Sequence, residues 1–257
     1  MNSIAAPAVL SERHITAGTV PRFELDEWRA FGITAGITGR SGDFDLGLFT
    51  QGAAGAILGR WLTLERTLRP GFTALAVARQ EHGREVQTHA EAGPGWRVSD
   101  AVDGHVTATP GLLLTVTVAD CIPVYVAHPD SGTMALLHAG WRGIAGGILE
   151  AGIGKLTELA KCSTSEVLMH CGVGICGACY QVGPEVIHKV TGRSVSGPES
   201  FDLRAALAER AGQAGLTRVT MSAWCTAHDE HLFFSHRRSQ GRDGRMVAYL
   251  GLPVSQG

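Results

Sequence analysis

Residues 111–143 read GLLLTVTVADCIPVYVAHPDSGTMALLHAGWRG, the most regular pattern in the chain. The first eight of these residues are apolar or β-branched on both faces, which is typical of a strand inside a sheet. Two more strands are expected at 123–127 and 133–137, on either side of the Pro-Asp-Ser-Gly turn at 129–132. Strands that follow one another this directly favour a mixed sheet over a regular doubly wound one.

The rest of the chain alternates helical and extended patterns around this centre. Apolar residues at helical spacing predict helices, and short apolar runs predict strands. The expected helices are 54–68, 144–159 and 203–211, and the further strands are 73–77, 167–170 and 218–222, with another strand and a tight connection within 31–48. We therefore expect an α+β (mixed α/β) fold in a single domain over residues 1–257, with residues 1–10 as a frayed terminus.

Composition excludes several classes of protein. The 257 residues carry a formal net charge of −2 and are 44% hydrophobic, which suits a globular protein with a large core and argues against a nucleic-acid binder. The longest uncharged apolar run, at about 111–119, is far shorter than the roughly 20 residues of a membrane helix. The first ten residues do not have the pattern of a secretory signal, so we expect a cytoplasmic protein with no membrane partner.

Three residues stand where predicted strands end, namely His82, Cys121 and His138. Cys121 and His138 end successive parts of one predicted strand system, so we expect their side chains to converge at one edge of a sheet. Imidazole and thiolate are good zinc ligands, and three protein ligands leave a fourth position for water or substrate. The alternative is that the histidines are hydrogen-bonded loop residues and that the cysteine fills space in the core.

A glycine-rich turn follows His138 directly and reads Gly140-Trp141-Arg142-Gly143. Backbone N–H groups at the start of a helix attract anions, and Arg142 could add a bidentate contact to phosphate. The alternative is an ordinary strand-to-helix turn.

Four of the six cysteines could form a second site. Cys171, Cys176 and Cys179 have the x4 and x2 spacing of a plant-type [2Fe–2S] loop, with Cys225 as a fourth ligand. The same residues could supply half of a structural zinc site, or they could be small thiols in a glycine-rich loop. A third candidate, residues 233–238 with Gly244-Arg245-Met246, could stack a base and bind phosphate, or anchor the core beside a basic edge.

Taken together, these stretches resemble the bacterial laccase-domain proteins, once called multicopper polyphenol oxidases and now treated as purine nucleoside phosphorylases. The resemblance covers roughly residues 73–250. Its motifs are Gln80-Glu81-His82-Gly83, Asp103-Gly104-His105-Val106-Thr107, Thr117-Val118-Ala119-Asp120-Cys121-Ile122-Pro123, His138-Ala139-Gly140-Trp141-Arg142-Gly143, the segment from Gly172 to Tyr180 with Val182-Gly183-Pro184-Glu185-Val186, Cys225-Thr226, Phe233-Phe234-Ser235-His236-Arg237-Arg238 and Gly244-Arg245-Met246.

The resemblance implies an α/β/β/α-like layered fold and one active-site zinc ion per chain, with His82, Cys121 and His138 as its ligands. It implies phosphorolysis of adenosine, inosine and methylthioadenosine, with purine nucleoside and phosphate as partners, and deamination of adenosine. Copper bound to this site is expected to be adventitious.

Roles for further residues follow from fitting this chemistry to the chain. We expect Arg142 and the turn from Gly140 to Gly143 to bind the anion. The matched motifs place Gln80 and Arg237 at the substrate as well. Asp120, next to a predicted ligand, would carry a proton or orient that ligand, and the alternative is a structural carboxylate that caps a turn.

The chain also departs from the family pattern. Its counterparts of Thr-Thr-Arg and Asn-Leu-Gly are Thr34-Ala35-Gly36 and Asp45-Leu46-Gly47, so an arginine and an asparagine are replaced. Arg40 could compensate for the missing arginine. His236 stands where a tyrosine is common, and Cys171 and Cys176 replace other residues of the pattern.

Three alternative functions remain open on the sequence. A zinc-dependent amidase that edits a muropeptide precursor would use the same three ligands. Copper-dependent phenol oxidation is the second alternative, and an iron–sulfur or binding protein centred on the four cysteines is the third. For the assembly, we expect a monomer or a homodimer.

Overall fold

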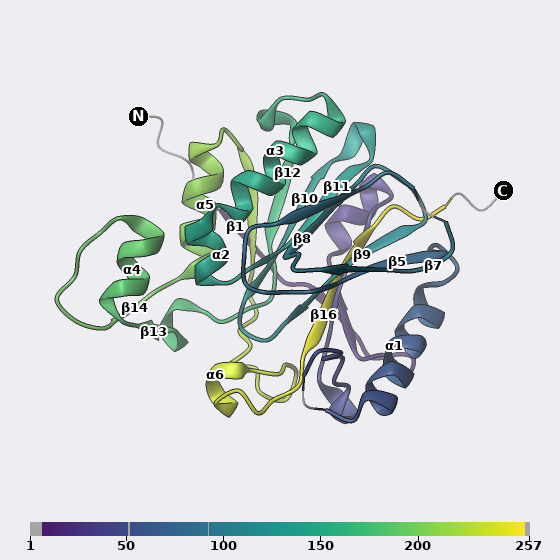
Figure 1. Ribbon diagram of the computed structural model, residues 1–257, viewed down its shortest axis with the longest axis horizontal. Helices are drawn as coiled ribbons and strands as arrows, with labels where there is room; N and C mark the ends of the chain where they lie inside the picture. Colours follow the sequence, from purple (N-terminus) through teal and green to yellow (C-terminus); the bar gives the residue numbers. More distant parts are fainter. Residues whose placement is uncertain (1–6, 51, 92, 255–257) are drawn as a thin grey trace.

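Two seven-stranded mixed sheets form the centre of the computed structural model, which describes residues 7–50, 52–91 and 93–254 (Figure 1). In order across the first sheet, the strands are β1 (Ala8–Leu10), β15 (Arg218–Ser222), β12 (Leu168–Cys171), β10 (Ile122–His128), β11 (Thr133–Ala139), β8 (Gly104–Thr107) and β6 (Val86–His89). The second sheet has the order β2 (Arg13–Ile15), β3 (Arg22–Glu24), β4 (Thr34–Thr38), β16 (Met246–Gly251), β9 (Leu112–Val118), β5 (Ala74–Arg79) and β7 (Gly95–Asp100).

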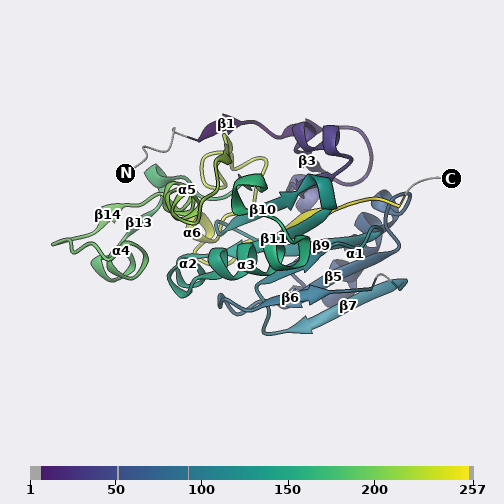
Figure 2. The same ribbon diagram turned by 90° about the horizontal axis from the view of Figure 1, so that it is seen from above.

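The described residues also form six α-helices, five short 3-10 helices and a small sheet. The helices are α1 (Ala54–Leu68), α2 (Trp141–Gly146), α3 (Ile148–Ala160), α4 (Pro184–Thr191), α5 (Leu203–Gln213) and α6 (His236–Ser239). The small sheet pairs β13 (Gln181–Val182) with β14 (Glu199–Ser200), and together with α4 it projects from one end of the molecule (Figure 2).

The alternation of side chains along the strands produces three separate layers of core. On β9, Leu112 and Leu114 lie in the core between the two sheets, whereas Leu113 packs in a second core with Trp61 of α1. On β10, Tyr125 lies between the sheets, and its neighbour Val124 belongs to a third core that contains α3 and α5. Because successive residues of a strand face opposite sides, a strand that is apolar throughout must be covered on both faces.

The order of layers is therefore helix, sheet, sheet, helix. Helices α3 and α5 cover the outer face of the first sheet, and α1 covers the outer face of the second (Figure 1). This arrangement confirms the mixed α/β fold and the α/β/β/α-like layering.

Two local predictions were wrong. The helix expected over 144–159 is broken at Gly147, whose φ of 90° is left-handed, so α2 ends there and α3 begins in a new direction. Residues 8–10, expected to be frayed, form the edge strand β1 and pair in parallel with β15. The remainder of that expectation, residues 1–6, lies outside the described residues. Among the described residues, no helix is both long and apolar enough to cross a membrane.

A buried histidine on β8 predicts how stability depends on pH. Burial is the main cause that lowers the pKa of His105 to about 3, and its Nδ1 lies 3.0 Å from Nε2 of His89. Below its ordinary pKa of about 6.5, the unfolded chain binds a proton that the folded chain excludes, so the free energy of unfolding falls as pH falls from about 6.5 toward 3.

In His105→Gln, the unfolded chain can no longer take up a proton at this position. The free energy of unfolding should therefore change less steeply with pH than in the wild type, by at most about 1.4 kcal/mol per pH unit, in urea unfolding measured between pH 6.5 and 4. The exposed His231 provides the control, and His231→Gln should keep the wild-type slope. An unchanged slope in His105→Gln would contradict this account.

Candidate functional site

The site lies where the chain passes from one sheet to the other. Strand β9 of the second sheet ends at Val118, and β10 of the first sheet begins at Ile122. The antiparallel register sets Pro123 opposite His138, so Cys121 lies at the same end of the first sheet as His138. His82 comes from the loop after β5, in the second sheet. Cys121 and His138 thus lie at one edge of one sheet, as predicted, whereas His82 reaches them from the other sheet.

His82, Cys121 and His138 nevertheless meet. Their ligand atoms all lie within 4.8 Å of one another, close enough to hold one metal ion. Gly140 is packed against them, and a Cβ added there would lie 2.9 Å from Sγ of Cys121 and 3.3 Å from Cδ2 of His82. The glycine of the turn is therefore required by the close approach of the backbone to the ligand cluster.

The electrostatics of the cluster favour a thiolate. Burial raises the pKa of Cys121, but His138 and His82 outweigh it and lower that pKa to about 6. Burial lowers the pKa of His138, but the Cys121 sulfur and the Asp103 carboxylate outweigh it and raise that pKa to about 9. A deprotonated thiol is the form that ligates a metal.

One carboxylate organises two of the three residues. Asp103, only 1% exposed, accepts hydrogen bonds from the backbone N–H groups of Glu81, His82 and Gly83 at 3.1, 2.9 and 2.7 Å. The same side chain lies 2.9 Å from Nδ1 of His138 through Oδ1, which leaves Nε2 to face the metal position. These bonds hold His82 at a positive φ of 60°, a conformation that non-glycine residues adopt rarely.

A cavity of about 550 Å³ opens in front of the cluster. Its lining includes all three candidate ligands and the three arginines Arg142, Arg237 and Arg245. The remaining lining residues are Gly47, Leu48, Phe49, Thr50, Gln80, Thr117, Ala119, Asp120, Gly140, Trp141, Tyr180 and His236. The cavity therefore combines a metal-ligand cluster, several cationic groups and aromatic surfaces.

Aromatic rings support two of the arginines. The guanidinium of Arg142 lies over the ring of Trp141 at 4.4 Å, and that of Arg237 lies over Tyr180 at 4.8 Å. Such stacking leaves the edge of the Arg142 guanidinium available to an anion, whereas Nη1 of Arg237 donates to the carbonyl of Gln181 at 2.8 Å, which leaves its other nitrogens for an anion. Burial is the main cause that raises the pKa of Tyr180 to about 12, so its phenol is protonated at neutral pH.

Two other predicted site residues, Gln80 and Gly143, are already in close contact with other parts of the chain. Gln80 lines the cavity, but its Nε2 donates to the carbonyl of Thr117 and its Oε1 accepts from N and Oγ1 of Thr117. Gly143 is buried outside the cavity lining, and a Cβ there would lie 2.8 Å from the carbonyl oxygen of Gly83. Their roles in binding substrate stay predictions, and the structure gives both a positioning role.

Asp120 also has a positioning role. Its Oδ1 accepts a hydrogen bond from Oγ1 of Thr226 at 2.6 Å, and its Oδ2 accepts one from the backbone N–H of Arg237 at 2.6 Å. Its φ of 84° lets the backbone turn between the two sheets immediately before Cys121. This geometry favours the orienting role over the proton-carrying one, which remains a prediction.

The departures from the family pattern lie partly in the site. Asp45 accepts hydrogen bonds from the backbone N–H groups of Gly47 and Arg245, and so joins two segments of the cavity wall. Gly36 lies on β4, where a Cβ would meet the backbone of Phe23 at 2.4 Å. Arg40 does not line this cavity, because its guanidinium stacks on Phe234 and pairs with Asp243, so the compensation expected of it is not seen.

The expected group of four cysteines is only partly formed. Cys171 is fully buried on β12, and burial raises its pKa to about 12. Cys176, Cys179 and Cys225 come together with His228 instead. Of the alternatives left open by the sequence, the [2Fe–2S] site that includes Cys171 is therefore the one that the structure contradicts.

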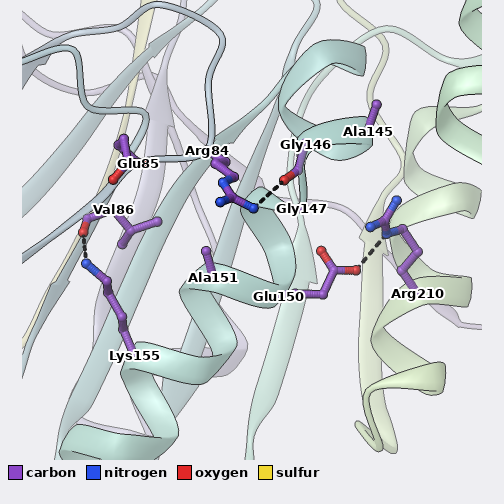
Figure 3. A pocket seen from close by; sticks show the side chains of 10 residues that line it. All are labelled: Arg84, Glu85, Val86, Ala145, Gly146, Gly147, Glu150, Ala151, Lys155 and Arg210. Atoms are coloured by element: carbon purple, nitrogen blue, oxygen red, sulfur yellow. Dashed lines mark hydrogen bonds and ion pairs between the residues drawn. The ribbon is translucent and has the colours of Figure 1, made fainter.

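A second hollow, of about 520 Å³, lies between Arg84, Lys155 and Arg210 (Figure 3). Each of these cations already has a partner: Arg84 donates to the carbonyl of Gly146, Lys155 to that of Val86, and Arg210 pairs with Glu150 at 2.7 Å. Neither metal-ligand cluster lies there. The cavity beside His82 is therefore the stronger candidate.

Comparison with known proteins finds relatives over most of the chain. A family model described as multi-copper polyphenol oxidoreductase laccase matches residues 29–253. Purine nucleoside phosphorylase YlmD of Geobacillus stearothermophilus is 34% identical over 209 residues, 76% of this chain and 73% of that protein. A purine nucleoside phosphorylase of Deinococcus radiodurans is 35% identical over 196 residues, 73% of this chain and 74% of that protein. The crystal structure of YlmD from Geobacillus stearothermophilus has a TM-score of 0.84 and 26% identity, over 93% of this chain and 98% of that one.

Sequence reasoning assigned no role to two residues of the site. Asp103 belongs to a quoted motif, but its contact with His138, 35 positions away, has no local signal. Tyr180 also lies in a quoted motif, and only the cavity places it beside the ligand cluster. Arg245 belonged to the candidate base- and phosphate-binding segment, and it lines the same cavity.

The carboxylate of Asp103 gives a direct test of the cluster. In Asp103→Asn, one of the two oxygens becomes an amide nitrogen, so at least one of its backbone N–H partners loses its acceptor and His138 loses its charged partner. Metal affinity should fall about 10- to 100-fold, as measured by competition with a chromophoric chelator.

The matched control is Asp100→Asn, because Asp100 is exposed and pairs only with Arg79 among the described residues. This control should bind metal as the wild type does. Equal affinity in Asp103→Asn and the wild type would show that the carboxylate does not organise the cluster.

Proposed function

Because the chain belongs to the multi-copper polyphenol oxidoreductase laccase family, we propose that it is a zinc-dependent purine nucleoside phosphorylase. The observation that carries the proposal is that one cavity contains both the His82, Cys121 and His138 cluster and three arginines. Adenosine, inosine and methylthioadenosine are the proposed nucleosides, and phosphate is the second substrate.

Two imidazoles and one thiolate fit a zinc ion, since this donor set leaves one open coordination position. When bound, such an ion acts as a Lewis acid and lowers the pKa of a coordinated water toward about 7. Copper also binds nitrogen and sulfur ligands tightly, so copper in a preparation would not by itself indicate phenol oxidation.

Phosphorolysis joins a phosphate oxygen to the anomeric carbon while the bond from that carbon to the purine nitrogen breaks. Arg142, Arg237 and Arg245 would bind and orient the phosphate, because cations fixed before the reaction stabilise the charge that develops. The purine would lie against Tyr180 or Trp141, whose rings form part of the wall. The phenol of Tyr180 keeps its proton at Oη, and it could donate that proton in a hydrogen bond to the departing base.

Deamination of adenosine would use the same cavity and is proposed as a side activity. The amidase alternative would share the three ligands, but three arginines around one cavity favour a phosphate co-substrate over an amide alone. A cytoplasmic location, the absence of a nucleic-acid partner and a monomeric or homodimeric state stay predictions.

Loss of the ligand cluster should abolish both zinc binding at this site and turnover. In Cys121→Ala and His82→Ala, the ion of this site should be lost, and phosphate-dependent release of hypoxanthine from inosine should fall at least 100-fold. Circular dichroism should show an unchanged fold. Full activity in a Cys121→Ala protein without metal at this site would remove the metal from the mechanism, and release of hypoxanthine without phosphate would exclude phosphorolysis.

The arginines should control the affinity for phosphate. Arg142→Gln removes a charged donor, worth about 1.5–3 kcal/mol, so the KM for phosphate should rise at least 10-fold while the KM for inosine changes little. Arg84→Gln is the control, because Arg84 lies in the other hollow. A KM for phosphate that is equal in Arg142→Gln and the wild type would contradict this role.

A further inference from the structure

A second group of metal-ligating side chains lies outside the proposed catalytic cluster. Cys176, Cys179, Cys225 and His228 bring one ligand atom each, and all four atoms lie within 4.8 Å of one another. The residues form two short pairs along the chain, Cys-x2-Cys at 176–179 and Cys-x2-His at 225–228. Such pairs, brought together from distant parts of a sequence, are the usual composition of a structural zinc site.

Local hydrogen bonds hold the two pairs in place. The carbonyl of Cys176 accepts a hydrogen bond from the N–H of Cys179 in a tight turn at 3.1 Å. The backbone N–H of Cys176 donates to Sγ of Cys225 at 3.3 Å, and Nδ1 of His228 lies 3.6 Å from Sγ of Cys176. Asp229 accepts the N–H of Cys225 at 2.8 Å and fixes the second loop.

These separations suit one ion. In a tetrahedral site with zinc–sulfur bonds of about 2.3 Å and zinc–nitrogen bonds of about 2.0 Å, neighbouring ligand atoms are roughly 3.5–3.8 Å apart. A plant-type iron–sulfur centre needs four cysteines, and the nearby Cys171 is buried in the core away from this group. Three thiols and an imidazole are a donor set that suits a single zinc ion.

We propose that Cys176, Cys179, Cys225 and His228 bind a second, structural zinc ion in a closed tetrahedral site. All four coordination positions are filled by the protein, so this ion offers no place for substrate. Zinc binding displaces one proton from each thiol that is protonated, and no oxidation or reduction is involved.

The ion would join two walls of the catalytic cavity. Tyr180, which lines the cavity, follows Cys179 directly. Thr226 follows Cys225, and its hydroxyl holds the carboxylate of Asp120 next to the ligand Cys121. Between the loops, the N–H of Thr226 donates to the carbonyl of Gly174 at 3.1 Å. One ion linking these loops would therefore position Tyr180 and Asp120.

Metal stoichiometry of the intact chain tests the proposal without any assay of activity. Protein purified under reducing conditions with zinc should contain two ions per chain by inductively coupled plasma mass spectrometry. Cys179→Ser and Cys225→Ser should each contain one ion, and Cys121→Ala should also contain one, since it retains the second site. The half-buried Cys162 supplies the control, and Cys162→Ser should contain two.

Two further measurements cover the case in which a variant does not fold. In the wild type, cobalt should give a thiolate-to-cobalt charge-transfer band whose intensity corresponds to four thiolates, three from this group and one from Cys121. His228→Cys should keep two ions, because a fourth thiolate can replace the imidazole. One ion in the wild type with a one-thiolate cobalt band would overturn the proposal, and so would a disulfide among Cys176, Cys179 and Cys225 in the native protein.

Discussion

The passage of the chain between the two sheets within three residues is the constraint on which the site depends. Ala119, Asp120 and Cys121 connect a strand of one sheet to a strand of the other. The crossing requires a left-handed backbone at Asp120, with its carboxylate held by Thr226 and by the N–H of Arg237. All three residues of the crossing line the cavity, so the crossing itself forms part of the wall of the site.

A second constraint on the site is the side chain of Asp103, which orients two of the three candidate metal ligands. It stands just before β8 and binds the loop that carries His82 as well as the imidazole of His138. Two residues from different sheets thus take their orientation from one buried carboxylate. Two of the six non-glycine residues with positive φ in the described part of the chain, His82 and Asp120, lie at this junction, and strained conformations often occur at functional sites.

Much of the fold could be predicted from the sequence because apolar periodicity reports burial directly. The strands around residues 112–139 and the helix at 54–68 were found by this pattern. The break at Gly147 was missed because glycine occurs on both sides of it and a tolerated glycine inside a helix has the same local pattern. Short edge strands such as β1 were missed because three paired residues leave little periodic signal.

The sequence by itself determined the mixed α/β class, through strands that are apolar on both faces, whereas the layering was predicted only from the resemblance to the family. The sequence also identified His82, Cys121 and His138 as residues able to ligate a metal. Only the tertiary structure decided which cysteines act together. Spacing grouped Cys171 with Cys176 and Cys179, whereas β12 buries Cys171 in the core and the second loop supplies His228 in its place. The physical reason is that a metal ion binds ligand atoms that are close together in space. The spacing of two residues along the chain determines the distance between their ligand atoms only when both belong to the same turn.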